Sequence, residues 1–201
     1  MPVIFGCTLI LIMLIRYKSK KHDRQSGMRI DEFLQRELEA NTTRKKDISG
    51  LPYLIADISR LPDLAGCPDP DGEIAGARKA LARLDGAKLL NLSGISNTDL
   101  KLTYGAANFP VLSECDSHYT AYTRGLQRLG SLLFDAGDNE RAALALEYAV
   151  ELKTDIRATY RLLGAIYEKQ GRSDAAAALR VREDELSEQL RGELLGVNDI
   201  L

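Results

Sequence analysis

The chain contains "LQRLGSLLFDAGDNERA" at residues 126–142 and "YRLLGAIYEKQGRSDAA" at residues 160–176. Laid side by side, both stretches place a large apolar or aromatic residue, a Leu-Gly pair, a second large residue, a glycine and an alanine at the same positions. Each matching pair lies 34 residues apart. Large residues recurring three and four places apart predict helices, and the later glycines predict the turns between them. The two stretches therefore predict two consecutive helical hairpins.

These matches resemble the tetratricopeptide repeat, whose period is 34 residues. The resemblance extends over residues 117–192, and its repeat-defining positions are Gly130, Gly137, Ala142, Gly164, Gly171 and Ala176. We expect Gly130 and Gly164 to let neighbouring helices approach closely, and Gly137 and Gly171 to turn the chain. The predicted fold class is all-α: an N-terminal transmembrane helix, then tetratricopeptide-like hairpins with an irregular arm packed on the first repeat.

The second copy differs from the first in its last helix. Arg180 and Glu183 stand where the first copy has Leu146 and Ala149. A polar outer face suits a terminal repeat, so residues 173–191 are predicted to form a capping helix, followed by a tail at residues 193–201. Because about three such repeats are usually needed for stability, the first repeat requires a cover. The preceding region, a second copy of the chain and a partner protein are the alternatives.

The N-terminal region predicts a membrane anchor at residues 1–16. Residues 2–15 carry no charge, and the basic sequence "RYKSKKHDR" follows directly. Positive flanks stay in the cytoplasm, which predicts a single-pass protein of the cell membrane with a cytoplasmic C-terminal domain. The basic cluster either contacts anionic lipid headgroups as well or acts only as a topology signal. The layout is similar to that of small membrane-anchored repeat proteins of Gram-positive bacteria.

Residues 17–49 are predicted to continue as a basic juxtamembrane segment and a stalk helix with an apolar stripe at Ile30, Phe33, Leu34 and Leu38. Residues 50–116 are predicted to hold an arm, a helix and a lid. The core of the arm, "YLIADIS", is a short extended segment without a sheet to join, and it should lie on the helices. The helix that follows has an apolar face at Ile74, Ala77, Leu81 and Leu84 and ends at Gly86.

The stretch "LSGISNTDLKLTYGAANFP" at residues 92–110 allows two interpretations. Its glycine, serine and asparagine residues would suit a binding loop. Its apolar residues would suit a lid over the first repeat, packed through Ile95, Leu100, Leu102 and Phe109. We favour the lid because the repeats need a cover. A short helix at residues 97–104, capped by Asn97 and ended by Gly105, fits that interpretation.

Chemical motifs are sparse. The "CDSH" segment at residues 115–118 has the spacing of half a zinc site, but the other half is missing. The sequence contains neither the residue order of a catalytic triad nor a phosphate-binding loop, so no catalytic residue, metal or cofactor is predicted. An enzyme therefore ranks third, after the two non-enzymatic functions given below. A net charge of -2 gives no reason to expect nucleic acid. A Cys67–Cys115 disulfide is not expected, and "EDE" at residues 183–185 should be a solvated helix face.

The family resemblance implies a concave groove, lined by the first helix of each repeat, that binds a protein or peptide. Mapped through the repeat, its positions are Arg124, Gln127, Ser131, Arg161 and Glu168. The two arginines could meet an acidic peptide, or they could simply be solvated. The Lys and Asn pattern by which the family clamps a terminal carboxylate is absent. The sequence therefore predicts a membrane-anchored adaptor, with a self-associating structural module, such as a homodimer, as the alternative.

Overall fold

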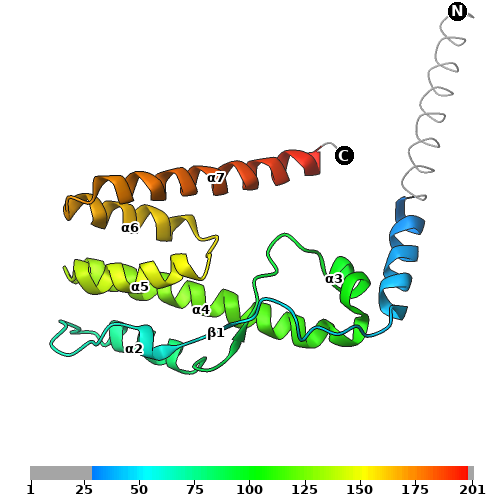
Figure 1. Ribbon diagram of the computed structural model, residues 1–201, viewed down its shortest axis with the longest axis horizontal. Coiled ribbons are helices and arrows are strands. Elements are labelled where there is room, and N and C mark those ends of the chain that lie inside the picture. The colour runs from blue at the N-terminus through cyan, green and yellow to red at the C-terminus, as the bar shows by residue number, and fades with distance from the viewer. Residues whose placement is uncertain (1–28, 199–201) are drawn as a thin grey trace, which may run out of the picture. The chain divides into compact units, whose positions relative to one another are not determined.

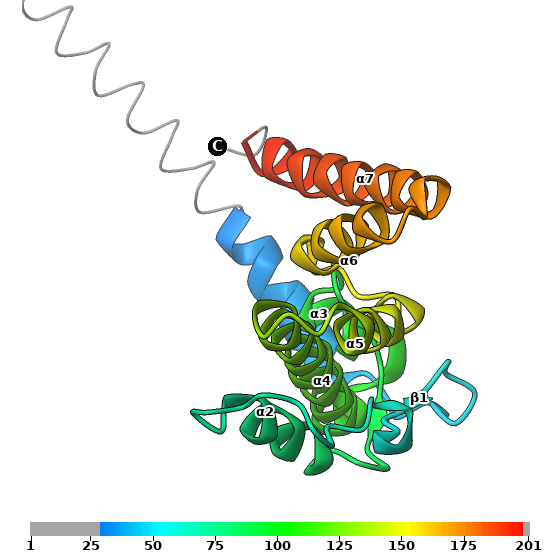
Figure 2. The same ribbon diagram turned by 90° about the vertical axis from the view of Figure 1, so that its left-hand side faces the viewer.

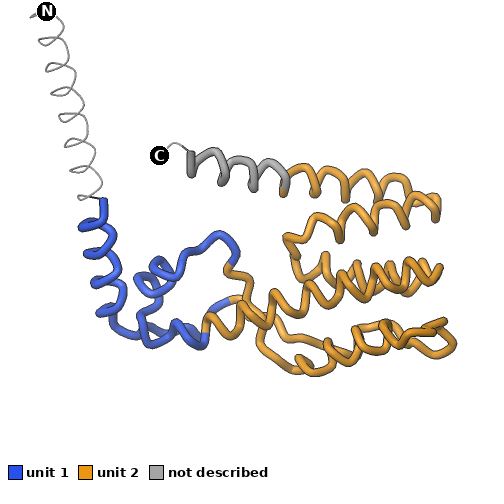
Figure 3. Tube along the Cα trace, turned by 180° about the vertical axis from the view of Figure 1, so that it is seen from behind, with its two compact units in different colours: residues 1–51, 93–111 blue, residues 52–92, 112–201 orange. Residues whose placement is uncertain are grey.

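The structure, a computed structural model, describes residues 29–198 and the side chains of residues 29–186. The chain is mostly helical, which confirms the predicted all-α class (Figure 1). It divides into two compact units: unit 1 holds residues up to 51 and residues 93–111, and unit 2 holds residues 52–92 and the chain from residue 112 (Figure 3). The predicted anchor at residues 1–16, the basic segment up to residue 28 and the last three residues of the tail lie outside the described residues.

Within the part of the chain that the structure describes, none of the helices combines the length and the apolar character that a membrane crossing requires.

Unit 2 is built on two antiparallel helical hairpins. Helices α4 (Phe109–Asp135) and α5 (Asn139–Glu151) form the first, and α6 (Arg157–Lys169) and α7 (Ser173–Asn198) form the second. The four helices stack in chain order (Figures 1 and 2). Their apolar stripes face inward, and the largest fully buried side chains are Leu112, Tyr119, Tyr122, Leu126, Leu129, Leu133, Leu146, Leu163 and Ile166. Burial of these stripes is the main stabilising contribution to the unit.

Both hairpin turns use glycine in the left-handed conformation. Gly137 has a φ of 84° and Gly171 a φ of 75°, values that residues with a Cβ rarely adopt. After the first turn, the side chain of Asp138 caps α5 by accepting a hydrogen bond from the backbone N–H of Arg141 at 3.0 Å. The turns at the two glycines lie where the repeat spacing places them.

The two glycines of the Leu-Gly pairs differ in their surroundings. A Cβ at Gly130 would lie 2.6 Å from both Cγ and Cδ2 of Leu146, so α4 and α5 approach closely at this point. At Gly164, the nearest atom to a Cβ would be the backbone oxygen of Ala176, at 4.0 Å. The predicted close approach is therefore present in the first hairpin, whereas the second has room for a methyl group.

Two helices are longer than the sequence predicted. Helix α4 begins at Phe109, before residue 117, where the predicted repeats start. Pro110 is tolerated in the first helical turn, because its missing N–H would have no intrahelical partner there. Helix α7 continues beyond Arg191 to Asn198, through a segment without proline.

The arm of unit 2 forms a small sheet, so the prediction that this segment has no strand to join is wrong. Strand β1 (Leu54–Ile55) pairs antiparallel with β2 (Lys88–Leu89), and Leu54 lies opposite Leu89. A 3-10 turn, η1 (Ile58–Arg60), follows β1. The arm buries Ala56 and Leu61 in the same hydrophobic core as the hairpins.

Helix α2 (Glu73–Ala82) lies beside α4 (Figure 2). Of its predicted apolar face, Ile74, Ala77 and Leu81 are buried and Leu84 is half-buried, and the helix ends at Ala82 rather than at the predicted Gly86. A Cβ at Gly125 of α4 would lie 2.6 Å from Cδ2 of Leu81, which shows how closely the two helices pack. Helix α2 and the arm therefore cover part of the first hairpin.

Unit 1 contains a helix at residues 29–42, helix α3 (Asn97–Tyr104) and the 3-10 turn η2 (Ala106–Asn108). Helix α3 has the predicted bounds, but Ser96 rather than Asn97 caps it, by accepting from the N–H of Asp99. Residues 43–46 cross α3 and η2 as a strap. The N–H of Lys46 donates to the oxygen of Tyr104 at 3.0 Å, and the buried Asn108 amide donates to the oxygens of Lys46 and Tyr104, each at 2.7 Å.

The four predicted lid residues all lie in unit 1. Leu100 is buried, Leu102 and Phe109 are half-buried, and Ile95 is 45% exposed. Lys101 lies over the ring of Phe109, with Nζ 5.4 Å from its centroid. Leu100 and Phe109 are thus packed within the chain, and their role as a cover for the first repeat stays a prediction.

Candidate functional site

The predicted groove residues of α4 share one side of the helix, where Gln127 and Ser131 are half-buried. Arg124 is exposed, and within the described chain it forms no ion pair. Gln127 donates from Nε2 to Oγ of Ser131, one turn further along, at 3.0 Å. A guanidinium and two small polar groups on one helix face can receive a carboxylate and backbone groups of a peptide.

The predicted groove residues of α6 contact α7 instead of standing free. Arg161 donates from Nη2 and Nε to one carboxylate oxygen of Glu183, at 2.6 and 3.2 Å. Glu168 forms an ion pair with Arg180. No hydrogen bond or ion pair between described residues joins Arg124, Gln127 or Ser131 to either of these α6 residues. The charges of Arg161 and Glu168, the α6 residues of the predicted groove, are therefore paired with charges of α7.

Glu183 is the residue that sequence reasoning missed. Its predicted place on a solvated face is wrong, because its side chain is only 15% exposed. It accepts from Arg157 at 3.4 Å as well as from Arg161. The two arginines stand four residues apart on one face of α6, and that spacing was the only available signal. In the second hairpin, Glu183 thus holds α7 against α6 through ion pairs. At the matching positions of the first hairpin, the apolar residues Leu146 and Ala149 stand instead.

The arm is fastened to α5 through two arginines. Arg60 lies over the ring of Tyr148, 4.3 Å from its centroid, and pairs with Glu151 at 2.5 Å. Arg141 donates to the backbone oxygen of Ala65 at 2.8 Å. Charge-assisted and cation–π contacts of this kind hold the arm in place beyond its two apolar side chains.

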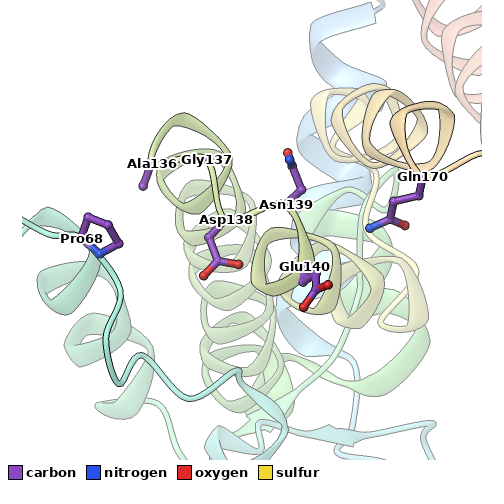
Figure 4. A pocket seen from close by; sticks show the side chains of 7 residues that line it. All are labelled: Pro68, Ala136, Gly137, Asp138, Asn139, Glu140 and Gln170. Atoms are coloured by element: carbon purple, nitrogen blue, oxygen red, sulfur yellow. The ribbon is translucent and has the colours of Figure 1, made fainter.

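An open depression lies at the turn between α4 and α5 (Figure 4). Its volume is about 550 Å³, and its lining residues are Pro68, Ala136, Gly137, Asp138, Asn139, Glu140 and Gln170. Although burial acts to raise it, the pKa of Asp138 is held below its ordinary value by hydrogen bonds from the backbone and side chain of Arg141. Asp138 is therefore an ionised helix cap rather than a proton donor or acceptor for catalysis.

Among residues 29–198, the sulfur and imidazole groups are not gathered into a metal site or a disulfide. Cys67 and Cys115 are both free thiols. Burial raises the pKa of the Cys115 thiol, which disfavours the reactive thiolate. Between residues 29 and 198, no group of three or more histidine, cysteine or acidic side chains is placed to hold a metal ion.

Exposed apolar side chains gather on the helix at residues 29–42. We name Ile30, Phe33, Leu34 and Leu38 the 30–38 stripe, and all four are at least half exposed, with Phe33 at 60%. The second half of this helix contacts α3, where Arg36 pairs with Asp99 at 2.5 Å and Glu37 lies 3.7 Å from Lys101. The sequence predicted the stripe, and the structure leaves it without an apolar partner in the described chain.

Buried tyrosines predict how stability responds to alkaline pH. Burial raises the pKa values of Tyr119, Tyr122, Tyr160 and Tyr167, and that of Tyr167, which also donates to Glu147, reaches about 12. Tyrosines of the unfolded chain ionise near their ordinary pKa of about 10. Above that pH the unfolded state loses protons that the folded state retains, so the free energy of unfolding should fall as pH rises towards 12.

Thermal unfolding followed at a series of alkaline pH values measures this loss. A Tyr167→Phe variant should show a flatter decline than the parent chain, because one of the four linked ionisations has been removed. Identical pH profiles for the two chains would contradict the assignment.

Comparisons of the chain with protein-family models, with curated proteins and with solved structures return no match. The interpretation of these surfaces therefore depends on their own geometry and chemistry.

Proposed function

We propose that the protein is a membrane-anchored adaptor of the tetratricopeptide type, which binds a protein partner at the cytosolic face of the membrane. The observation that carries the proposal is the equivalence of residues 34 positions apart. Leu129 and Leu163 are buried on the first helix of their hairpins, Gly137 and Gly171 adopt the same left-handed turn, and Ala142 and Ala176 are buried on the second helix. A period of 34 residues with a helix-turn-helix unit is the signature of this repeat.

The surface proposed for the partner is the exposed side of α4. Arg124 is exposed and pairs with no acidic group among the described residues, whereas Arg161 of α6 is paired with Glu183. Gln127 and Ser131 add hydrogen-bonding groups one and two turns along the same helix. A short acidic peptide segment fits this chemistry, since a carboxylate can pair with the guanidinium while amide and hydroxyl groups meet the peptide backbone.

The covered flank of the first hairpin favours the adaptor over the self-associating module. Helix α2 and the arm supply Ile74, Ala77, Leu81, Ala56 and Leu61 to the same core. A second copy of the chain is therefore not required to bury the first repeat. The polar cap at α7 completes the other end, as expected for a repeat array that ends there.

The proposed anchor is the apolar run at residues 2–15 with its basic flank. It supports membrane attachment because Arg16, Lys18, Lys20, Lys21 and Arg24 follow the run directly, which favours retention of the repeat domain on the cytosolic side. Only the sequence supports the anchor, since these residues precede the part of the chain that the structure describes.

Charge reversal at Arg124 tests the proposed surface. The full chain is purified from solubilised membranes as the parent protein, as Arg124→Glu and as the control Lys79→Glu, which reverses an exposed charge on α2. We expect a partner protein to copurify with the parent and with the control. Recovery of that partner should fall about tenfold or more with Arg124→Glu, the factor that corresponds to one well-placed charge contact.

Equal recovery of the partner with both variants would contradict the assignment of the α4 surface. Light scattering on the same purified chain adds the second readout. A stable dimer without any other protein would favour the self-associating module instead of the adaptor.

A further inference from the structure

The 30–38 stripe shares its face of the helix with Glu37 and Asn41, through which Lys101 holds the C-terminal half of the helix. Ala40 is fully buried, Arg36 pairs with Asp99, and Lys101 lies 3.7 Å from a carboxylate oxygen of Glu37. Lys101 also donates to the side-chain oxygen of Asn41 at 2.9 Å. These contacts fix the helix to α3 through its C-terminal half. Beside these contacts, Ile30, Phe33, Leu34 and Leu38 remain at least half exposed.

The spacing of the stripe does not suit pairing with a second copy as a coiled coil. Such a seam alternates apolar residues three and four places apart and continues through successive turns. After Ile30 and Phe33, the next seam positions are Glu37 and Ala40. Glu37 is held by Lys101 and Thr98, and Ala40 is buried within unit 1. The exposed apolar residues therefore do not continue along the seam positions. They form a short, broad apolar face instead of a coiled-coil seam.

The position of the helix in the chain limits where that face can be. Only residues 16–28 separate the apolar run at residues 2–15 from Arg29 at the start of the helix. Fourteen extended steps reach at most about 50 Å, and contact of the basic flank with headgroups would shorten the reach to the five steps from Arg24, about 18 Å. A chain anchored through residues 2–15 therefore keeps the first turn of the helix within reach of the headgroup region.

We propose that the helix at residues 29–42 lies in the plane of the membrane interface and inserts the 30–38 stripe at the boundary between headgroups and acyl chains. This inference rests on the anchor in the proposed function. It differs from a stalk, in which the same four side chains would face water. Amphipathic helices of this kind bury their apolar face by about 5–10 Å.

The charges of the helix indicate which lipids it needs. Acidic residues Asp31, Glu32, Glu37 and Glu39 outnumber the basic residues Arg29 and Arg36. The contact between this helix and the membrane is therefore driven by insertion of the apolar side chains and not by attraction to anionic headgroups. A neutral phosphatidylcholine surface is sufficient, and the contact should persist at high salt, which screens charge but not apolar burial.

The absence of tryptophan from the sequence gives a direct test. Phe33→Trp places a single indole on the stripe, and Glu39→Trp places one on an exposed position of the same helix away from the stripe. Each full chain is reconstituted in phosphatidylcholine vesicles with and without brominated acyl chains, and circular dichroism verifies that both fold as the parent does. We expect the Phe33→Trp emission to be blue-shifted and to lose more than half its intensity with brominated lipid. The Glu39→Trp emission should resemble that of an indole in water and change little.

Each other outcome overturns the inference in a distinguishable way. A Phe33→Trp chain that floats with the vesicles but emits as in water, without quenching, leaves the anchor standing and makes the helix a stalk. A blue shift without quenching means that protein, from a second copy or from unit 2, covers the stripe. A chain that does not float with the vesicles removes both the anchor and the interfacial helix. Leu34→Trp on the same stripe repeats the measurement if Phe33→Trp fails to fold.

Discussion

Replacing Gly105 by alanine should unfold unit 1 selectively. Gly105 has a φ of 92°, and a Cβ there would lie 2.3 Å from the backbone oxygen of Arg44 and 2.7 Å from Cα of Lys45. These are backbone atoms of the strap, so they cannot move aside without breaking the hydrogen bonds between residues 43–46 and the α3–η2 corner. Backbone strain and overpacking each cost about 1–3 kcal/mol, and together we expect a loss of about 3 kcal/mol or more.

Hydrogen exchange resolves where this loss occurs. The amides of Lys46 and Ala106, which donate to Tyr104 and Thr43, should lose protection, while amides in the core of α5 keep theirs. Gly66→Ala is the matched control, since Gly66 has a φ of 74° but a Cβ would meet nothing within 4 Å. If both variants retain equal protection at Lys46, the close contact between Gly105 and the strap is not a determinant of stability.

Alanine at Gly130 and alanine at Gly164 should act in opposite directions. At Gly130 the new methyl group would overlap Leu146, which is fully buried and has no space to withdraw into, and the expected cost is about 1–3 kcal/mol. At Gly164 the nearest atom is 4.0 Å away, so the gain in helix propensity, up to about 1 kcal/mol, should prevail. Urea denaturation midpoints of the two variants and the parent measure the difference.

A double substitution identifies the contact. Leu146→Ala alone should destabilise the protein by leaving a cavity, and the methyl group of Gly130→Ala should fill part of that cavity. The double variant should therefore be more stable than the sum of the two single effects implies. Strict additivity, or an equal loss at Gly130 and Gly164, would contradict the close packing of α4 on α5.

The elements that the sequence predicted are those with local signals. Helix α3 was located because a capping residue and the stop at Gly105 bracket a short segment of the chain. The hairpin turns were located because Gly137 and Gly171 recur at a fixed interval, and a left-handed turn requires such a residue. Periodicity and turn chemistry are properties of short stretches, so they can be recognised without knowledge of the rest of the fold.

The features that the sequence did not predict depend on distant contacts. Strands β1 and β2 are each two residues long, which is too short to show an alternating pattern, and their pairing follows from how the arm packs on the core. The burial of Glu183 depends on the approach of α6 with its two arginines. For the same reason, the groove predicted from the repeat placed Arg161 and Glu168 correctly on α6 but could not show that α7 neutralises them.

Photo-crosslinking in native membranes tests the central claim most directly. A photoreactive phenylalanine analogue is introduced at Ser131, on the exposed side of α4, and, as a control, at Val181, an exposed residue of α7. The adaptor proposal predicts a discrete adduct with one other protein from position 131, which disappears when Arg124→Glu is added, and no such adduct from position 181. Adducts only with a second copy of the chain, or no adduct from position 131 in membranes where the protein is abundant, would contradict it.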